Sequence, residues 1–374
     1  MKIGLITNSI DEKSGGIGTY SYELIKNFSM MGVPNEYYLI HHTPIDMDIY
    51  STNNEILIKS YSNFYKATMW RMINAPLKLK FIKELDLVHD PYEIGPLSFK
   101  MPFKKVMTIH DLTPIIFPHA FGLPIVLLHK LLLTRTLKTA DKIITDSNST
   151  KNDLINYFNI PEEKIRVILL AADEKFKPLS NKEIKEAKQK YNLNFPFILY
   201  VGTLEPRKNI PSLIKAFYKL KKKNLQYKLV IAGKKGWKYK EIFETIDKLN
   251  LQSDVVFTGY VPDEDLPALY NAADLFVYPS VYEGFGLPPL EAMACGTPVI
   301  TSNTSSLPEV VGDAGIMVDP YDVDRLADAM QEVLTDEGLR ADMTKKGLGR
   351  AKMFSWEKCA RETLRVYEEV YNEM

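Results

Sequence analysis

The sequence predicts an α/β protein built from two parallel-sheet domains. Short apolar strands alternate with turns and amphipathic helices along the whole chain, which is the pattern of parallel α/β architecture. The series of strands is interrupted once, by a polar stretch rich in Lys, Glu and Asn (Lys177 to Lys190), and then starts again. At roughly 150 residues per domain, the 374 residues also suggest two domains of ordinary size.

The strands of both series can be placed along the chain. The first series comprises Lys2 to Thr7, Tyr37 to Ile40, Leu87 to His89, Lys105 to Ile109, Lys142 to Asp146 and Ile165 to Leu169. The second comprises Phe197 to Val201, Lys228 to Ala232, Val255 to Thr258, Leu275 to Tyr278, Pro298 to Thr301 and Ile316 to Val318. Helical patterns such as Gly18 to Met31 and Leu123 to Thr139 lie between strands. We expect one domain over residues 1–180, a second over 181–354 and a C-terminal helix over 355–374.

Composition excludes several classes of protein. Lys and Arg together number 47, as do Asp and Glu, so the formal charge is zero and a dedicated nucleic-acid-binding protein is not expected. The two cysteines, Cys295 and Cys359, cannot form a disulfide framework. The chain opens on a strand rather than on a charged leader, and its best apolar candidate, Phe121 to Leu133, is too short to span a bilayer. We therefore expect a cytoplasmic protein without membrane spans.

The first motif with chemical content is Ser14-Gly15-Gly16-Ile17-Gly18, after the opening strand. Glycines there allow a phosphate to approach the backbone, and the helix that follows offers N-terminal N–H groups. Dinucleotide binding is not expected, because Ser21 occupies the place of the third glycine and no acidic residue ends the second strand. The motif alone also fits an ordinary strand–helix turn.

The second motif is Glu283-Gly284-Phe285-Gly286-Leu287-Pro288-Pro289-Leu290-Glu291, which follows the strand Leu275 to Tyr278 and opens a helix. Its two glutamates are eight residues apart, so the first can face a reaction centre while the second lies on the first helical turns. The N–H groups of Gly286 and Leu287 would meet a diphosphate at the positive end of the helix dipole. The alternative is a Gly-Pro turn with a glutamate placed for that dipole.

The third motif is Gly202-Thr203-Leu204-Glu205-Pro206-Arg207-Lys208-Asn209, directly after the strand Phe197 to Val201. Adjacent Arg and Lys side chains at a strand-to-helix turn suit a pyrophosphate, the first as a planar fork and the second as a point charge. The alternative is a pair of solvated surface charges.

Together the three motifs resemble the retaining glycosyltransferase family 4, which has the GT-B fold. The resemblance spans nearly the whole chain, and the E-x7-E segment with its Gly-Phe-Gly-Leu interior is its most specific part. It implies two Rossmann-like domains whose parallel sheets face each other across a cleft, with the C-terminal helix crossing back to the first domain. It also implies transfer of a hexosyl unit from a nucleotide sugar with retention of anomeric configuration.

The resemblance assigns roles to the residues of the E-x7-E segment. Glu283 would contact the hydroxyls of the transferred sugar, and Glu291 would hold the nucleotide ribose. The residues between them that would supply backbone N–H groups to sugar and diphosphate are Gly284, Phe285, Gly286 and Leu287.

The remaining donor-binding residues follow from the other motifs. Arg207 and Lys208 would bind the diphosphate, and Gly15 and Gly16 would approach the same phosphates from the first domain. Tyr260 and Val261 would face the base. One departure concerns Thr203, after Gly202: many members carry Arg there, and we expect Arg207 to take over that role.

His110-Asp111 follows the strand Lys105 to Ile109. By resemblance, His110 reaches the donor sugar and belongs to the catalytic set with Glu283, Lys208 and Arg207. The alternative is a strand-end histidine whose ring is satisfied by neighbouring backbone, and Asp111 also suits a helix N-cap.

No metal and no cofactor are expected beyond the nucleotide-sugar co-substrate. Asp-x-Asp pairs occur at Asp46-Met47-Asp48, Asp263-Glu264-Asp265 and Asp322-Val323-Asp324, but with 47 acidic residues chance pairs are expected. The last two open helices, where acids complement the dipole. In the resembled fold, cationic side chains and helix N-termini replace the ion, and the leaving phosphate itself deprotonates the acceptor.

The favoured donor is GDP-mannose, with UDP-glucose or UDP-N-acetylglucosamine as alternatives and a non-catalytic sugar-nucleotide-binding subunit as the alternative from another class. We expect a glycan or lipid-linked acceptor against the first domain, near Tyr92 to Pro96 and Leu112 to Gly122. A local excess of basic residues between Lys59 and Lys105, beside the apolar segment Ile115 to Leu133, suggests peripheral contact with an anionic membrane. An ordinary basic surface is the alternative.

Overall fold

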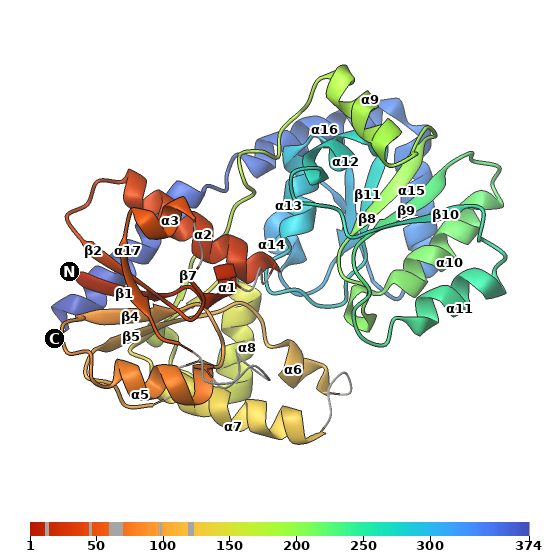
Figure 1. Cartoon of the computed structure of the whole chain (residues 1–374). Helices are drawn as coiled ribbons and strands as arrows, with labels where there is room; N and C mark the ends of the chain where they lie inside the picture. The colour runs from red at the N-terminus through yellow and green to blue at the C-terminus, as the bar shows by residue number, and fades with distance from the viewer. Residues whose placement is uncertain are drawn as a thin grey trace. The chain divides into compact units, whose positions relative to one another are not determined.

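Two separate α/β units make up the chain (Figure 1). The structure, a computed structural model, describes residues 1–11, 15–44, 47–59, 70–95, 97, 99–118 and 123–373. Unit 1 comprises Met1–Leu170 with Ser355–Met374, and unit 2 comprises Ala171–Phe354. The predicted α/β fold class with two parallel sheets is confirmed.

Unit 1 contains a seven-stranded parallel sheet with strand order β3-β2-β1-β4-β5-β6-β7. Its strands are β1 (Lys2–Ile6), β2 (Glu36–His41), β3 (Asn54–Leu57), β4 (Leu87–Asp90), β5 (Lys104–Ile109), β6 (Lys142–Thr145) and β7 (Ile165–Val167). Its helices are α1 (Asn8–Asp11), α2 (Gly15–Met30), α3 (Asp48–Ser51), the π-helical turn η1 (Trp70–Asn74), α5 (Ala75–Leu79), α6 (Thr113–Ile116), α7 (Leu123–Thr139), α8 (Asn148–Phe158), the 3₁₀ turn η4 (Glu162–Lys164) and α17 (Trp356–Asn372).

The central strands of unit 1 are apolar on both faces because helices cover both faces of a parallel sheet. Every residue of β4 is buried, and so is every residue of β5 after Lys104. The chain proceeds outward from β1 to β3 on one side and from β4 to β7 on the other. The reversal between β1 and β4 is the kind of switch point where open α/β sheets bind ligands, beyond the carboxyl ends of the strands.

Helix α17 packs in unit 1, against α2, β5 and β6, as the predicted fold class requires. Its N-terminus is capped by Ser355, whose hydroxyl accepts a hydrogen bond from the Lys358 N–H. On its apolar face Tyr367 is fully buried, and the Tyr367 hydroxyl lies 2.6 Å from His89 Nδ1 on β4. This buried polar contact fixes the C-terminal helix to the sheet.

Unit 2 contains a six-stranded parallel sheet with strand order β10-β9-β8-β11-β12-β13. Its strands are β8 (Phe197–Val201), β9 (Lys228–Ala232), β10 (Val255–Gly259), β11 (Leu275–Tyr278), β12 (Val299–Ser302) and β13 (Ile316–Val318). Its helices are α9 (Asn181–Lys190), the 3₁₀ turn η5 (Pro206–Lys208), α10 (Ile210–Lys221), α11 (Lys240–Lys248), α12 (Leu266–Ala272), α13 (Leu287–Ala294), α14 (Leu307–Val311), α15 (Val323–Thr335) and α16 (Glu337–Ala351). The switch point here lies between β8 and β11.

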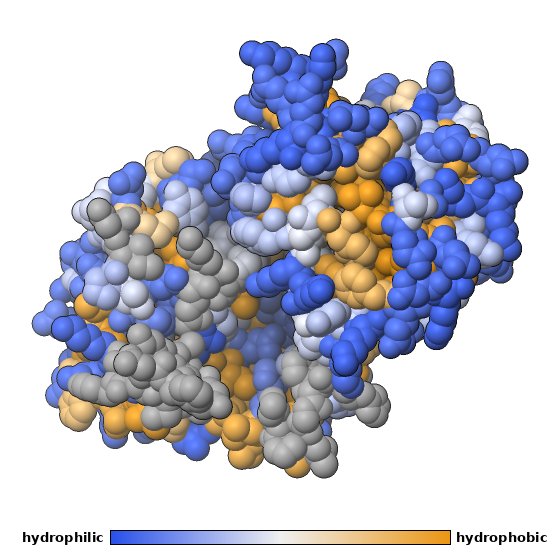
Figure 2. All heavy atoms as spheres, turned by 45° about the vertical axis from the view of Figure 1, so that its right-hand side comes forward, coloured by the Kyte–Doolittle hydropathy of each residue, from blue (hydrophilic) through white to orange (hydrophobic). Residues whose placement is uncertain are grey.

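The first helix of unit 2, α9, is a surface helix. None of its residues is buried, and Figure 2 shows it as hydrophilic at the top of the view. A capping box holds its N-terminus: Ser180 Oγ accepts from the Glu183 N–H, and the Glu183 carboxylate accepts from the Ser180 N–H at 2.9 Å. The polar stretch that marks the break between the two strand series is therefore a capped, solvated helix.

The structure departs from the predicted elements in three places. Strand β3, Asn54–Leu57, was not predicted, because an edge strand with two apolar residues and no buried ones carries a weak pattern. Helix α2 begins at Gly15, three residues before the predicted Gly18. The division between the units falls after Leu170, whereas the predicted domain boundary falls after residue 180.

Candidate active site

The switch point of unit 2 brings two of the sequence motifs together. Strands β8 and β11 are hydrogen-bonded neighbours, so the segments that follow them start from the same edge of the sheet. The loop after β8 carries Gly202 to Lys208, and the loop after β11 carries Ser280 to Glu283.

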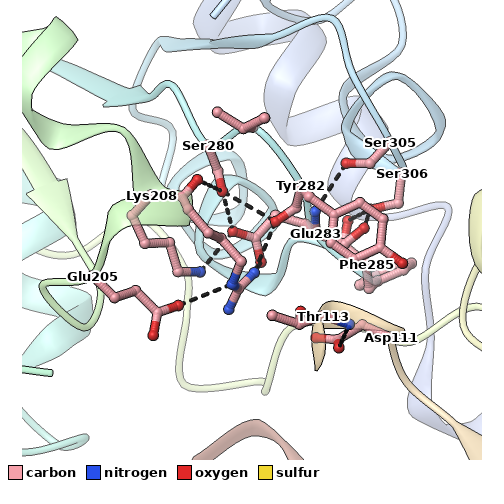
Figure 3. Close-up of polar contacts among 12 residues, drawn as sticks. Asp111, Thr113, Glu205, Lys208, Ser280, Tyr282, Glu283, Phe285, Ser305 and Ser306 are labelled. Carbon is pink, nitrogen blue, oxygen red and sulfur yellow. Dashed lines mark hydrogen bonds and ion pairs between the residues drawn. The ribbon is translucent and has the colours of Figure 1, made fainter. Parts of the chain in front are cut away.

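Glu283 is the centre of a buried polar cluster in these loops (Figure 3). Its Oε1 atom accepts hydrogen bonds from Lys208 Nζ at 2.6 Å and from Ser280 Oγ at 2.5 Å. Its Oε2 atom accepts from Arg207 Nη1 at 2.8 Å. The Tyr278 hydroxyl accepts from Lys208 Nζ and donates to Glu283 Oε1 at 3.1 Å. The structure thus joins Glu283, Lys208 and Arg207, three of the four predicted catalytic residues.

The electrostatics of the cluster keep Glu283 ionised. Burial alone would raise the pKa of Glu283, but the Arg207 and Lys208 cations, with the hydrogen bonds from Lys208 and Ser280, lower that pKa to about 2. Burial and the neighbouring Arg207 lower the pKa of Lys208, and Glu283 opposes them. An ionised carboxylate can only accept hydrogen bonds. Glu283 can therefore accept hydrogen bonds from hydroxyl groups, and it is not a proton donor at neutral pH.

Sequence reasoning missed two members of the cluster, Glu205 and Ser280. Glu205 accepts from Arg207 Nε at 2.9 Å through Oε1 and from Trp237 Nε1 at 3.0 Å through Oε2. Glu205 and Glu283 carry two negative charges and Arg207 and Lys208 carry two positive charges, so the net charge of these four groups is zero. Their positions directly after β8 and β11 are the signal that would have identified both missed residues.

The two loops are also joined through their backbones, which fixes the cluster. The Val281 N–H donates to the Arg207 carbonyl at 2.9 Å. Asn209, in the left-handed conformation at φ 55°, donates from its side-chain amide to the carbonyls of Pro279 at 3.2 Å and Pro320 at 2.6 Å. A left-handed residue at this point ends η5 and begins α10, so the sequence Arg-Lys-Asn places both cations toward β11.

The glycine turn after Glu283 leads directly into α13. Gly286 precedes α13 with φ 110°, and a Cβ there would lie 2.8 Å from Leu307 Cδ2, so the position requires glycine. Ser306 Oγ donates to the carbonyls of Glu283 at 2.9 Å and Phe285 at 2.7 Å. The Phe285 ring is buried and lies edge-on to Phe354, so this side chain packs in the core of unit 2.

Glu291, the second glutamate of the motif, lies on α13 and is half-buried. Its Oε2 atom accepts a hydrogen bond from the Tyr270 hydroxyl at 2.9 Å. Burial raises the pKa of Glu291 to about 7, although the Tyr270 hydrogen bond acts in the opposite direction. The predicted contact of Glu291 with a ribose stays a prediction.

The other predicted donor-binding residues of unit 2 lie at the same sheet edge. Gly202 and Thr203 follow β8 and are half-buried, and the Gly202 N–H extends the ladder to the Ala232 carbonyl at 2.9 Å. After β10, Tyr260 is exposed and Val261 is buried. Of this last pair, only Tyr260 presents its side chain to a ligand from solvent.

In unit 1, His110 follows β5 and pairs with a buried carboxylate. His110 Nδ1 lies 2.6 Å from Asp146 Oδ2, and its ring stands edge-on to Tyr20 at 5.0 Å. Burial alone would lower the pKa of His110, but the Asp146 carboxylate raises that pKa above its ordinary value. His110 Nε2 is buried and has no hydrogen-bond partner among the described residues. The partner of the His110 ring is therefore the Asp146 side chain, and not the neighbouring backbone of the alternative interpretation.

The glycine motif of unit 1 lies partly in helix α2. Gly15, with φ 51°, and Gly16 form its first turn and are exposed, while Ser14 lies outside the described residues. A Cβ on Gly18 would lie 2.9 Å from the Ser9 carbonyl oxygen, so Gly18 is required for packing against α1. Helix packing alone therefore accounts for the glycine at position 18, and no ligand is needed to explain it.

The acceptor segments are only partly within the described residues, since Pro96 and residues 119–122 lie outside them. Next to Tyr92, the Glu93 carboxylate lies 3.1 Å from His129 Nε2 on α7. Asp111 accepts a hydrogen bond from the Thr113 N–H at 2.7 Å, but the N-cap of α6 is Leu112, so Asp111 lies one residue before the predicted cap position.

In two of the three Asp-x-Asp pairs, acidic side chains have other partners. Asp265 binds Lys190 and Tyr191, Asp324 binds Lys219, and Asp322 caps α15, while Asp46 lies outside the described residues. Within the described ranges no three His, Cys, Asp or Glu residues gather as a metal-binding group. None of the helices in the described part of the chain has the length and apolar character needed to cross a membrane.

Comparison with known proteins agrees with this arrangement. Residues 14–175 match the family model of Glycosyltransferase Family 4, and residues 181–350 match that of Glycosyl transferases group 1. The O-antigen chain mannosyltransferase B of Escherichia coli is 36% identical over 382 residues, covering 98% of this chain and 100% of that protein.

Solved structures share the fold over the full chain. Sucrose-phosphate synthase (tll1590) from Thermosynechococcus elongatus has a TM-score of 0.82 at 24% identity, with 100% of both chains covered. Anabaena Alr3699/HepE, solved in complex with UDP-glucose, has a TM-score of 0.78 at 20% identity and covers 99% of this chain and 100% of its own. The chain has the GT-B fold and belongs to the glycosyltransferases of family 4, with a group 1 glycosyltransferase domain in its second half.

Proposed function

We propose that this glycosyltransferase transfers a mannosyl unit from GDP-mannose to a glycan or lipid-linked acceptor in surface polysaccharide synthesis, with retention of anomeric configuration. The observation that carries the proposal is the buried cluster of Glu283, Arg207 and Lys208 at the switch point of unit 2. The name of the Escherichia coli relative, a mannosyltransferase of the O-antigen chain, supports the choice of sugar and pathway class.

The cluster suits the charge that develops during transfer. When the nucleotide leaves the anomeric carbon, negative charge grows on its β-phosphate and positive charge on the sugar ring. In the proposed mechanism Arg207 and Lys208 stabilise the phosphate, an electrostatic contribution of roughly 3 kcal/mol per removed donor in comparable sites. Since Glu205 and Glu283 already balance these cations, an incoming diphosphate would draw the cations partly away from the two carboxylates.

Glu283 would then accept hydrogen bonds from hydroxyl groups of the sugar. Its low pKa makes it an acceptor at neutral pH, so the leaving phosphate rather than this residue would take the proton of the acceptor hydroxyl. We propose that Glu291 binds the ribose. The backbone N–H groups of residues Gly284 to Leu287 are proposed to bind the sugar and the diphosphate.

His110 is proposed to contact the donor sugar through Nε2. Asp146 holds Nδ1 at 2.6 Å, which fixes the ring and leaves Nε2 as the nitrogen for the sugar. Gly15 and Gly16, exposed at the start of α2, are proposed to approach the diphosphate, and Thr203 and Tyr260 to lie near the nucleotide.

We further propose that transfer requires no divalent metal and no cofactor. Cationic side chains supply the charge that an ion would supply in a metal-dependent transferase. We also propose a cytoplasmic protein with peripheral membrane contact, because a lipid-linked acceptor would be offered at a membrane surface.

A panel of nucleotides and nucleotide sugars tests the donor. We expect GDP and GDP-mannose to raise the melting temperature, with and without EDTA, and UDP to have no effect. Stabilisation by UDP alone would favour the UDP-glucose or UDP-N-acetylglucosamine alternative, for which the UDP-glucose complex of the Anabaena neighbour is the supporting observation. Stabilisation without nucleotide release in the presence of acceptor would favour the non-catalytic subunit.

A further inference from the structure

Two helical segments of unit 1 expose apolar side chains on their outer faces. On η1, α5 and the residue pair after α5, Ile73, Leu77 and Phe81 are spaced four apart, and Phe81 is 78% exposed. On α7, Leu127, Leu128 and Leu131 are all more than half exposed, Leu131 by 69%. Thirteen large apolar or aromatic side chains are exposed among the described residues, and these six are nearly half of them.

Both segments cover the same face of the sheet. The segment containing α5 connects β3 to β4, and α7 connects β5 to β6, and both connections advance in the same direction along the strand order. Right-handed crossovers that advance in one direction place their helices on one face. The buried sides of the two segments meet in one core, which includes Trp70 and Leu79 with Leu133 and Leu137. Figure 2 shows apolar atoms along the lower edge of unit 1, where Figure 1 places α5 and α7.

The charges on the two segments have one sign. Residues 70–83 contain four basic residues and no acidic one, and α7 contains Lys130, Arg135 and Lys138 and no acidic one. Lys78, Lys80 and Lys83 are exposed beside Leu77 and Phe81. Helices that carry Leu and Phe on the outer face with Lys and Arg beside them lie in the headgroup region of anionic bilayers.

We propose that the outer faces of residues 70–83 and α7 form a docking surface for an anionic phospholipid bilayer. This inference deepens the proposed function, because it names the surface that would hold unit 1 at a lipid-linked acceptor. The leucine and phenylalanine side chains enter the headgroup region, and the lysines contact the lipid phosphates. Lysines near an anionic surface strengthen binding individually and are screened by salt.

Sedimentation of the full chain with vesicles tests the proposal. We expect binding to phosphatidylcholine vesicles that contain phosphatidylglycerol, much weaker binding to phosphatidylcholine alone, and loss of binding at high salt. The double variant Leu127→Gln/Leu131→Gln should lower the partition constant on anionic vesicles on the order of tenfold. The variant Lys78→Glu/Lys80→Glu should lower it at least about fivefold for each lysine.

Matched control variants distinguish binding through this surface from nonspecific binding to vesicles. Met30→Gln removes an exposed apolar side chain from α2, and Lys182→Glu reverses an exposed charge on α9, so both should bind vesicles as the unaltered chain does. Absence of binding to anionic vesicles at low salt would overturn the proposal, and so would an equal loss in Met30→Gln. A dimer in lipid-free solution that Leu127→Gln/Leu131→Gln dissociates would instead assign the surface to a second copy of the chain.

Measurements on the same variants distinguish the proposed docking surface from the proposed GDP-mannose donor. Each variant should retain its circular dichroism spectrum and its stabilisation by GDP, because all the altered side chains are exposed. If no nucleotide stabilises the unaltered chain, the donor proposal fails while the vesicle result stands. If nucleotides stabilise every variant but none of the proteins binds vesicles, only the docking surface fails.

Discussion

Replacing Glu283 by Gln is expected to destabilise unit 2 and to abolish most of the turnover. The best orientation of the amide keeps its oxygen where Lys208 and Ser280 donate. Its NH₂ group then faces Arg207 Nη1, which in the unaltered chain donates to Glu283 Oε2 at 2.8 Å. Two donors would then face each other in a buried site. Two buried cations would also lose the carboxylate between them.

The magnitude follows from the pKa of the carboxyl group. A change from an ordinary value of 4.5 to about 2 on folding corresponds to about 3 kcal/mol of stability. Removing one partner of a buried ion pair costs about 3–5 kcal/mol, in the same range. Because the pKa of Glu283 is lower in the folded chain, this stability is present above pH 4.5 and is lost as the pH falls through about 2.

Urea unfolding of both proteins from neutral pH to about pH 3 measures this effect. We expect Glu283→Gln to be less stable by about 3 kcal/mol at neutral pH, with the difference shrinking below pH 4.5. Glu332→Gln, which breaks an exposed pair with Arg325, should cost less than about 1 kcal/mol. Nucleotide release by Glu283→Gln should fall about a hundredfold or more. A stability difference that is absent, or that does not depend on pH, would refute the reasoning.

Three other variants test separate parts of the site. His110→Ala should lower nucleotide release on the order of a hundredfold, and unchanged release would remove His110 from the catalytic set. Gly286→Ala should lower the free energy of unfolding by about 1–3 kcal/mol, and adding Leu307→Ala should restore part of the loss if the 2.8 Å contact is its cause. Tyr270→Phe should raise the pKa of Glu291 further above about 7, because the lost hydrogen bond lowers it now; a carboxyl carbon resonance that titrates at a lower pH would contradict this.

Much of the fold was predictable because parallel sheets have a strong local pattern. The twelve predicted strands are short apolar runs followed by turns, and the structure contains a strand at each of them. The exception is β3, where Asn54–Leu57 pairs only at the edge of the sheet and needs no continuous apolar run. An edge strand of this kind is specified by its partner β2 rather than by its own residues.

The candidate site was predictable in its residue types but not in its contacts. The Arg-Lys pair and Glu283 were identifiable because they follow strands, whereas their mutual distances depend on the β8–β11 pairing, which joins segments some 75 residues apart. In unit 1, the pairing of β5 with β6 likewise makes Asp146 a partner of His110. Local sequence patterns carry no information on such pairs.

Calorimetric titration with GDP in the presence of EDTA tests the central claim most directly, namely that the Glu283 cluster of unit 2 binds a nucleotide diphosphate. The account predicts binding to the unaltered chain, at least tenfold weaker binding to Lys208→Ala, and unchanged binding to Lys219→Ala, which removes an exposed lysine paired with Asp324. Equal GDP affinity in the unaltered chain and Lys208→Ala would contradict it.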